Sequence, residues 1–302
     1  MNKILVICGA TASGKTSLAV ECAKKLNTEV ISADSQLIYK GLNIGTAKPT
    51  AEEMCGIKHH MIDTVEPSES FNVGNYREKA LPIMKNLLAS GKIPVICGGT
   101  GFYINSLLFD FSYGNTEGNG EIRKKYSDFL ETHGKEALFE KLREIDAETA
   151  EKLHVNDIKR IIRALEIYEL SGKKKSEEND TLISEYDYLA VAIDWKREEL
   201  YERINMRVDK MFEDGLVEEV QGLLSRGIDE KFQCMQAIGY KEVVFGLKNG
   251  DLHSTMRDII KQNTRHYAKR QIVFFKKLPN IVWLNPKDAT AEHIAEMLNG
   301  SK

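Results

Sequence analysis

Short apolar runs alternate with longer amphipathic stretches over about the first third of the chain. Apolar runs bounded by glycine or polar residues predict buried strands, and apolar positions three or four apart predict helices. This alternation favours an α/β fold with a parallel sheet, in which ligands bind beyond the carboxyl ends of the strands. The predicted strands are Ile4–Cys8, Glu29–Ala33 and Ile93–Cys97, and the predicted helices are Ser17–Leu26, Ala51–Cys55 and Tyr76–Ser90.

The pattern changes in the middle of the chain. Ser112–Gly120 is rich in glycine and asparagine and is typical of a linker, Glu121–Leu170 predicts consecutive charged helices without a strand, and Ser171–Asp180 predicts a loop. We interpret residues 114–183 as a helical domain inserted into an α/β core formed by residues 1–113 and 184–302. The second part of that core contains predicted strands at Tyr188–Ile193 and Asn280–Leu284, with mostly helical segments at Lys196–Leu224 and Gln236–Phe275.

Composition narrows the class of protein. Of 302 residues, 42% are hydrophobic and 29% charged, which is typical of a globular protein, and the net charge of −3 argues against a uniformly basic nucleic-acid surface. The five cysteines form no C-x-x-C pair, so we expect most of them to be small buried hydrophobes. No apolar stretch reaches the ~18 residues of a membrane span, and we expect a cytoplasmic protein.

A phosphate-binding loop follows the first predicted strand. Gly9, Ala10, Thr11, Ala12, Ser13, Gly14, Lys15 and Thr16 fit G-x-x-x-x-G-K-[ST] in the required strand–loop–helix context. The glycines allow backbone amides to face an anion, and the helix N-terminus adds its positive end. Lys15 is expected to reach a terminal phosphate, and the Thr16 hydroxyl to hold Mg²⁺. The loop predicts phosphate or pyrophosphate binding and does not by itself indicate ATP.

Polar or glycine-rich residues also follow the next two strands. Asp34 is either a catalytic carboxylate or the cap of a turn over Ser35–Tyr39. Gly98–Tyr103 indicates either close approach of the backbone to a ligand, with the Thr100 hydroxyl available, or a tightly packed strand-to-helix turn. His59 and His60 form a pair without spaced acidic residues, which favours a structural role over a metal site.

Basic residues gather in three later segments. Lys159, Arg160 and Arg163 form a stripe that either binds phosphates or is simply solvated. One of Arg197, Arg203 and Arg207 could reach the phosphate loop, but their spacing does not say which. Thr264–Gln271 mixes basic and aromatic residues and predicts either a nucleic-acid surface or an exposed helix end.

Together these motifs resemble the tRNA dimethylallyltransferase family, also called tRNA isopentenyltransferases. The resemblance covers nearly the whole chain, and the segments occur in the family's order. They are GATASGKTSLA, ISADSQLIYKGLNIGTAKP, HHMID, GGTGFYINSLL, NDIKRIIRALEIYELSGK, RINMRVDKMFEDGLVEEV, MQAIGYKE and TRHYAKRQ.

The resemblance implies a P-loop NTPase-like core with an inserted helical domain that grips tRNA. It also implies transfer of a dimethylallyl group from dimethylallyl pyrophosphate to N6 of adenosine 37, next to the anticodon of tRNAs that read codons beginning with U. The enzyme would be a monomer that uses Mg²⁺. A P-loop small-molecule kinase, a free-adenylate isopentenyltransferase and a non-catalytic RNA-binding protein are the alternative functions.

The resemblance further implies roles for individual residues. Asp34 would be the general base, Thr100 would lie at the reaction channel, and Arg207 would clamp the pyrophosphate held by Thr11–Thr16. The residues implied to contact tRNA are Asp34, Ser35, Gln36, Leu37, Thr100, Arg123, Lys159, Arg160, Ile161, Ile162 and Arg163.

Overall fold

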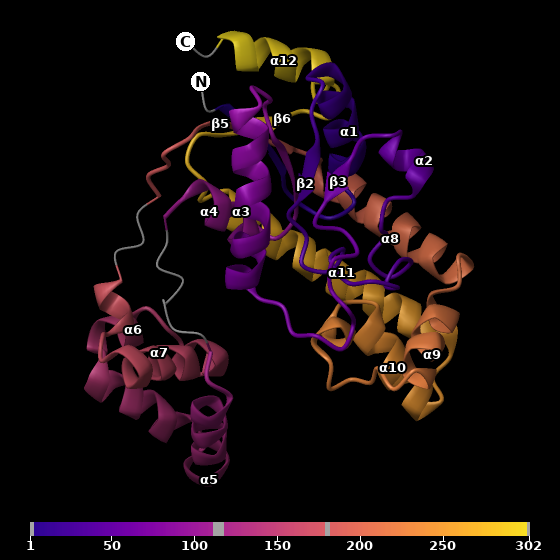
Figure 1. The fold of residues 1–302 in the computed structure, drawn as a ribbon. Helices are drawn as coiled ribbons and strands as arrows, with labels where there is room; N and C mark the ends of the chain where they lie inside the picture. Colours follow the sequence, from indigo (N-terminus) through magenta and orange to yellow (C-terminus); the bar gives the residue numbers. More distant parts are fainter. Residues whose placement is uncertain (1–2, 111–117, 179–181, 301–302) are drawn as a thin grey trace. The chain divides into compact units, whose positions relative to one another are not determined.

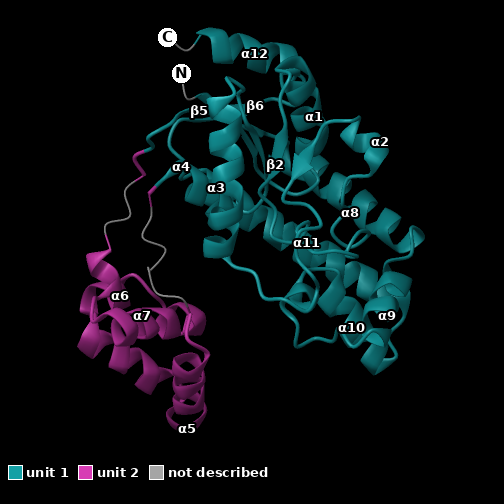
Figure 2. Ribbon diagram, in the orientation of Figure 1, with its two compact units in different colours: residues 1–109, 184–302 teal, residues 110–183 magenta. Residues whose placement is uncertain are grey.

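The computed structural model describes residues 3–110, 118–178 and 182–300. The chain divides into two compact units, one formed by residues 1–109 and 184–302 and the other by residues 110–183 (Figure 2). The start that the sequence predicts for the insertion, residue 114, lies outside the described residues, as does most of the predicted linker Ser112–Gly120.

A six-stranded, entirely parallel sheet forms the centre of the first unit (Figure 1). The strand order is β3-β2-β4-β1-β5-β6, which confirms the predicted fold class. β1 lies in the interior of the sheet and is buried along its whole length, which explains why it reads as a continuous apolar run. The strands are β1 Lys3–Cys8, β2 Val30–Ser32, β3 His59–His60, β4 Val95–Gly98, β5 Asp187–Ile193 and β6 Ile281–Leu284.

Helices flank this sheet. The two-residue strand β3 and the last helix, α12, had no counterpart in the sequence prediction, and the glycine-rich turn after β4 leads into a further helix, α4. The helices of this unit are α1 Lys15–Lys25, α2 Ala51–Met54, α3 Val73–Ala89, α4 Gly101–Leu108, α8 Arg197–Glu213, α9 Leu216–Ser225, η2 Gln233–Gln236, α10 Tyr240–Asn249, α11 His253–Phe275 and α12 Ala291–Gly300.

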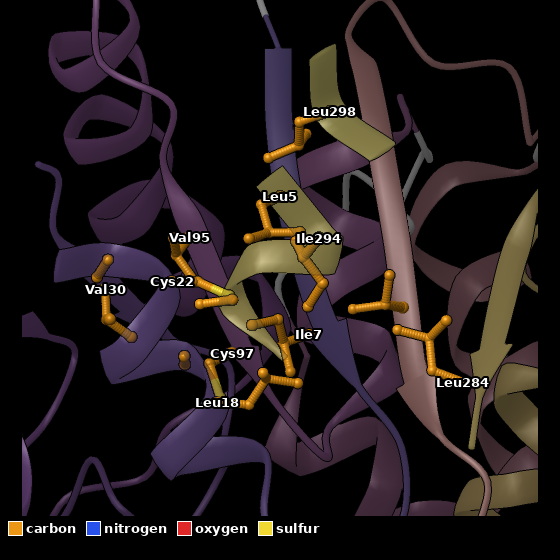
Figure 3. Close-up of a cluster of buried hydrophobic side chains, with 14 residues drawn as sticks. Leu5, Ile7, Leu18, Cys22, Val30, Val95, Cys97, Leu284, Ile294 and Leu298 are labelled. Atoms are coloured by element: carbon orange, nitrogen blue, oxygen red, sulfur yellow. The ribbon is translucent and has the colours of Figure 1, made fainter. Parts of the chain in front are cut away.

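One hydrophobic core lies where α1 and α12 cover one face of the sheet. Leu5 and Ile7 of β1 pack with Leu18 of α1, Ile294 of α12 and Leu284 of β6 (Figure 3). Each such fully buried aliphatic side chain stabilises the fold by about 1.5–3 kcal/mol relative to its exposed state. The core therefore fixes the start of α1, and with it the phosphate loop, against the middle of the sheet.

The second unit is helical, with its own small core. It contains α5 Gly120–Ile145, α6 Ala147–Glu151, α7 Ile158–Ser171 and the short η1 Lys175–Glu177, which lies within the predicted loop. Non-helical backbone at Gly134 divides α5 into two segments. Tyr126, Leu138 and Leu142 pack against Ile161 and Leu165 of α7, so the unit buries its apolar residues internally.

Two glycines provide opposite tests of this packing. A Cβ at Gly98 would lie 2.1 Å from the Ala33 carbonyl oxygen, whereas a Cβ at Gly222 in α9 would meet nothing within 4 Å. We expect Gly98→Ala to lower the free energy of unfolding by about 1–3 kcal/mol. We expect Gly222→Ala to raise it by about 0.5–1 kcal/mol, because alanine loses less backbone entropy in a helix. Urea unfolding measures both, and equal effects of the two changes would contradict the close approach of β4 and β2.

Candidate active site

The phosphate loop adopts an unusual backbone conformation between β1 and α1. Gly9, Ala12 and Gly14 have positive φ angles of 123°, 61° and 94°. A positive φ is uncommon for alanine because of its Cβ, so the surrounding structure must stabilise the conformation at Ala12.

Side chains of α8 and the segment before it provide this support. Arg203 Nε donates to the Ala12 carbonyl at 2.8 Å, and Trp195 Nε1 donates to the Ser13 carbonyl at 2.9 Å. The Arg203 guanidinium also lies over the Trp195 ring, 4.4 Å from its centroid. Because N–H and C=O point in opposite directions in a trans peptide, the amides of Ser13 and Gly14 point away from these donors. The loop therefore keeps these amides turned away from α8.

Gln271 of α11 joins the phosphate loop to the turn after β4. Its Oε1 accepts from Thr11 N at 2.8 Å, and its Nε2 donates to the Gly99 carbonyl at 3.0 Å. A Cβ at Gly99 would lie 2.2 Å from Gln271 Nε2, and one at Gly101 would lie 2.0 Å from the Phe274 ring. These glycines make room for protein atoms, so the tight-packing interpretation of Gly98–Tyr103 is the correct one for them.

Asp34 caps a turn and also lines a pocket. Its Oδ1 accepts from Gln36 N at 2.8 Å and from Leu37 N at 3.4 Å, so the carboxylate does cap the turn that follows β2. The second oxygen, Oδ2, takes part in neither hydrogen bond. The same residue lines a pocket together with Lys15 and Arg207, so capping and a place in the site are compatible.

Thr100 lies beside the Asp34 turn. Its Oγ1 accepts from Ser35 N at 3.0 Å, and its backbone N–H donates to the Ala33 carbonyl at 3.0 Å. These contacts fix the hydroxyl next to residues 35–37.

The pocket collects residues from segments that lie far apart in the chain. The phosphate loop supplies Thr11, Lys15 and Thr16, and the turn after β2 supplies Asp34 and Leu37. The next loop supplies Thr46 and Ala47, and the end of β4 with the turn after it supplies Gly98 and Gly99. Helix α8 supplies Arg207, and α11 supplies Tyr267 and Gln271. Lys15, Thr16 and Arg207 also line an adjacent hollow with Ala12–Ser17, Arg203 and Met206. A group bound at these three shared residues would contact both hollows.

Two half-buried cations give the pocket its charge. Burial lowers the pKa of Lys15 to about 8, with nearby Arg207 lowering it further while Cys97 and Asp34 oppose the shift. Burial also lowers the pKa of the Arg207 guanidinium. Lys15 Nζ donates to the Ala10 carbonyl, and Arg207 Nη2 donates to the Thr46 carbonyl at 3.1 Å. Burying a charge is unfavourable unless it is paired, so a polyanion is the ligand that this pair of cations fits best.

The structure also decides among the arginines of α8. Arg203 and Arg207 reach the phosphate loop or its pocket, whereas Arg197 lies over the Tyr201 ring. Sequence reasoning missed Gln271 and Trp195, and it left Arg203 as one of three candidates. Their contacts span 260, 182 and 191 positions, so no local pattern reveals them. The only sequence signal is their presence within the family segments RINMRVDK and TRHYAKRQ or just before them.

Each histidine of the pair has one protein partner, but among the described residues nothing hydrogen-bonds the buried Nε2 of His59. His59 Nδ1 lies 2.9 Å from the Ile57 carbonyl, and His60 Nε2 lies 2.6 Å from Glu29 Oε2. Among the described residues, no group of three or more histidine, cysteine or acidic side chains is arranged to hold a metal ion. Cys8, Cys22, Cys97 and Cys234 are buried and Cys55 is exposed, which confirms the expectation for most of the cysteines.

The residues predicted to contact tRNA in the helical unit differ in accessibility. Lys159 and Arg160 are exposed at the start of α7. Arg123 and Arg163 both pair with the fully buried Glu166, at 2.9 and 2.6 Å. These arginines, with the Asn119 backbone N–H, hold the pKa of Glu166 below its usual range despite its burial.

The structure corrects the prediction for Ile161. Its side chain is 0% exposed in the core of the helical unit, so it supports the helix and is not available to tRNA. Ile162 is half-buried against the same core.

No helix among residues 3–110, 118–178 and 182–300 is both long and apolar enough to cross a membrane.

The parallel sheet and the loop that carries Lys15 define a P-loop α/β protein. The profile of the IPP transferase family matches residues 37–278. A tRNA dimethylallyltransferase of Acetivibrio thermocellus is 46% identical over 94% of this chain and 92% of its own length. Another, from Caldanaerobacter subterraneus, is 48% identical over 97% of this chain and 95% of its own length.

Solved structures agree with these relatives. The tRNA isopentenylpyrophosphate transferase of Bacillus halodurans is 39% identical with a TM-score of 0.74, covering 99% of this chain and 97% of that one. A eukaryotic dimethylallyltransferase described as acting on tRNA is 31% identical with a TM-score of 0.82, covering 97% of this chain and 77% of that one. The chain belongs to the IPP transferase family, and the resemblance seen in its motifs is confirmed.

The pKa of Lys15 predicts how anion binding depends on pH. Below about 8 the free lysine is charged, and above it the lysine is neutral. A bound diphosphate stabilises the charged form, so we expect its affinity to fall by up to about tenfold per pH unit above this value. Calorimetric titration with inorganic pyrophosphate between pH 6.5 and 9.5 measures this affinity. The control is Lys15→Arg, because arginine stays charged over the whole range. A parallel decline in both proteins would contradict the assignment to Lys15.

Proposed function

We propose that this protein transfers the dimethylallyl group of dimethylallyl pyrophosphate to N6 of an adenosine in tRNA and releases pyrophosphate. The observation that carries the proposal is the convergence of Lys15, Arg207 and Asp34 on one pocket. Relatives named for dimethylallyl transfer to tRNA, 46–48% identical over most of the chain, support the same reaction. These names do not favour the kinase or the free-adenylate alternative.

The pyrophosphate leaves at the phosphate loop. The bond between the allylic carbon and the bridging oxygen breaks, and its electron pair stays on the pyrophosphate. Lys15 and Arg207 stabilise this growing negative charge, and they do so strongly because they are half-buried. Their hydrogen bonds to the Ala10 and Thr46 carbonyls hold them in place before the substrate arrives.

The adenosine is activated by a carboxylate in the same pocket. An adenine N6 amine is a weak nucleophile because its lone pair is delocalised into the ring, so removal of its proton as the N–C bond forms assists the reaction. Asp34 accepts this proton through Oδ2, while Oδ1 keeps the turn over residues 36–37 in place. Gln36 and Leu37 donate to this carboxylate, and Ser35 donates to Thr100 beside the same turn. These four residues would contact the base, which must leave its stack to react.

The first turn of α1 fits a magnesium ion. Thr16 is exposed and lines both hollows beside Lys15, so its hydroxyl offers the hard oxygen ligand that Mg²⁺ prefers. When bound there with the diphosphate, the ion would neutralise part of the leaving group's charge.

The helical unit grips tRNA through basic side chains. Lys159 and Arg160 are exposed, and Glu166 orients the guanidinium groups of Arg123 and Arg163. Such groups suit the phosphates of an RNA stem-loop. We further propose a monomeric, cytoplasmic enzyme, consistent with a tRNA substrate.

Asp34→Asn separates chemistry from binding. The amide keeps an oxygen that can accept from Gln36 N and Leu37 N, but it cannot accept the N6 proton. We expect single-turnover prenyl transfer to fall by about 10²–10⁴-fold. Radiolabelled dimethylallyl pyrophosphate with bulk tRNA measures the rate, and pyrophosphate affinity should stay within about twofold. A normal rate with weakened tRNA binding would sink the role of Asp34 as base.

Removal of Lys159 and Arg160 tests the tRNA surface. We expect the double alanine variant to lower the slope of log affinity against log salt by about 0.7–0.9 for each lost phosphate contact. The control is the double alanine variant of Lys24 and Lys25, which removes the same charge at the end of α1 opposite the phosphate loop. An unchanged slope in the first variant would place those side chains in solvent in the complex.

A further inference from the structure

Residues 42–48 form a loop that is a wall of the pocket. Thr46 and Ala47 line it directly, as does Pro49 immediately beyond. The loop is closed by its own hydrogen bonds, from Ala47 N to the Ile44 carbonyl at 3.0 Å and from Lys48 N to the Asn43 carbonyl at 2.9 Å. It contains no helix or strand, so contacts from elsewhere must set its position.

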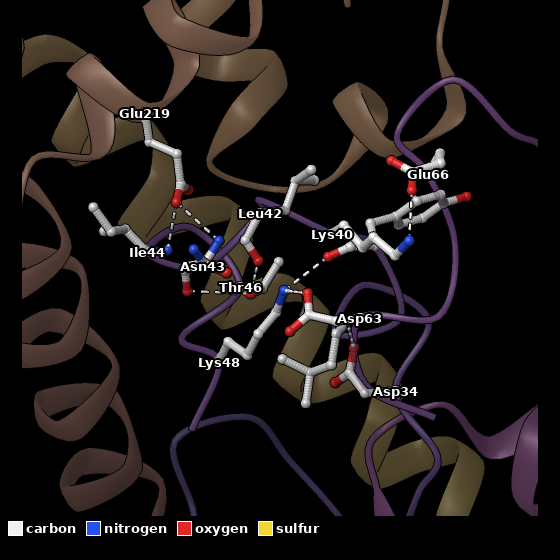
Figure 4. Close-up of polar contacts among 12 residues, drawn as sticks. Asp34, Lys40, Leu42, Asn43, Ile44, Thr46, Lys48, Asp63, Glu66 and Glu219 are labelled. Carbon is white, nitrogen blue, oxygen red and sulfur yellow. Dashed lines mark hydrogen bonds and ion pairs between the residues drawn. The ribbon is translucent and has the colours of Figure 1, made fainter. Parts of the chain in front are cut away.

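Glu219 of α9 supplies the main contact (Figure 4). Its carboxylate accepts from three successive backbone amides, Asn43 N at 2.8 Å, Ile44 N at 2.9 Å and Gly45 N at 3.1 Å. It also accepts from Tyr240 Oη at 2.6 Å. Hydrogen bonds to an ionised acceptor are roughly twice as strong as neutral ones, so one side chain fixes three consecutive peptides.

Gly45 allows this arrangement. A Cβ there would lie 2.5 Å from the Tyr240 ring, so a larger residue would push the loop away from Glu219. Tyr240 is fully buried, and burial together with Glu219 raises the pKa of its hydroxyl. It therefore remains a hydrogen-bond donor to Glu219.

The fixed peptides lead directly to the pyrophosphate clamp. The carbonyl of Thr46, one residue beyond the last amide bound by Glu219, accepts from Arg207 Nη2 at 3.1 Å. On the other side, Lys48 Nζ donates to the Tyr39 carbonyl at 2.7 Å and pairs with Asp63. The bond to the Tyr39 carbonyl joins the loop to the segment that begins at Asp34 (Figure 4).

We propose that Glu219 is a positioning residue that orients Arg207 toward the pyrophosphate through the loop of residues 42–48. The inference rests on the proposed function for the identity of the anion. It has an unusual consequence, because removal of a negative charge should weaken the binding of a polyanion. Simple electrostatics predicts the opposite.

Glu219→Gln tests this consequence, with Glu218→Gln as the matched control. Glu218 carries the same charge one residue earlier but is exposed. We expect Glu219→Gln to weaken pyrophosphate binding in calorimetry and to raise KM for dimethylallyl pyrophosphate by about tenfold each, with a smaller change in kcat. Glu218→Gln should leave both unchanged. Unchanged or tighter pyrophosphate binding in a folded Glu219→Gln variant would overturn the proposal.

A double-mutant cycle shows whether Glu219 acts through Arg207. In an Arg207→Ala background, Glu219→Gln should weaken pyrophosphate binding no further, whereas additive losses would overturn the proposal. Should Glu219→Gln fail to fold, Tyr240→Phe removes one donor to the same carboxylate and should weaken pyrophosphate binding less, in the same direction. An unchanged affinity in Tyr240→Phe would then count against it.

Failure of the proposed function gives a different result. If wild-type protein binds pyrophosphate with the expected dependence on Glu219 but transfers no prenyl group to tRNA, the reaction is wrong and the positioning role stands. If wild-type protein is active and Glu219→Gln binds pyrophosphate normally, only the positioning role is wrong.

Discussion

The site depends on the direction in which the peptides of the phosphate loop face. Their amides can face an anion only if the carbonyls on the opposite side find other donors, because buried backbone groups must be paired. Trp195 and Arg203 supply two of these donors to Ser13 and Ala12. The first loop of the chain is therefore completed by side chains from its second half.

The core also tolerates a helical domain between β4 and β5, because the two points where the chain leaves and re-enters it lie side by side. The insertion leaves the core at Phe109 and the chain re-enters at Ser184, and these two residues form an antiparallel bridge. Adjacent entry and exit points allow the core to close without the insertion. β1 can then pair with β4 on one side and β5 on the other, which places α8 after β5 and beside the loop.

The sequence was sufficient to predict what is local. The strands and most of the helices follow from apolar periodicity, and the phosphate loop from a motif that carries its own mechanism. It was not sufficient for β3, whose two residues, His59 and His60, are too few to form a pattern. It also could not identify Gln271, because the two loops that this residue joins lie about 170 and 260 positions earlier. Ile161 shows the opposite error, since a contiguous motif includes positions that only support its helix.

The partners of the cations distinguish the two parts of the protein. In the pocket, Lys15, Arg203 and Arg207 donate to backbone carbonyls, which orient them without cancelling their charge. Glu219 of α9, which holds the loop of residues 42–48, is occupied by backbone amides of that loop and by Tyr240.

In the helical unit, by contrast, Arg123 and Arg163 share the buried carboxylate of Glu166, which compensates part of their charge. A diphosphate carries its charge on a few atoms and needs uncompensated cations close to it, whereas RNA spreads its charge along a backbone and is held by several weaker contacts. The carbonyl-bound cations thus suit a small diphosphate, and the carboxylate-bound arginines suit an extended RNA backbone. The difference therefore lies in the partners that each unit supplies to its own cations.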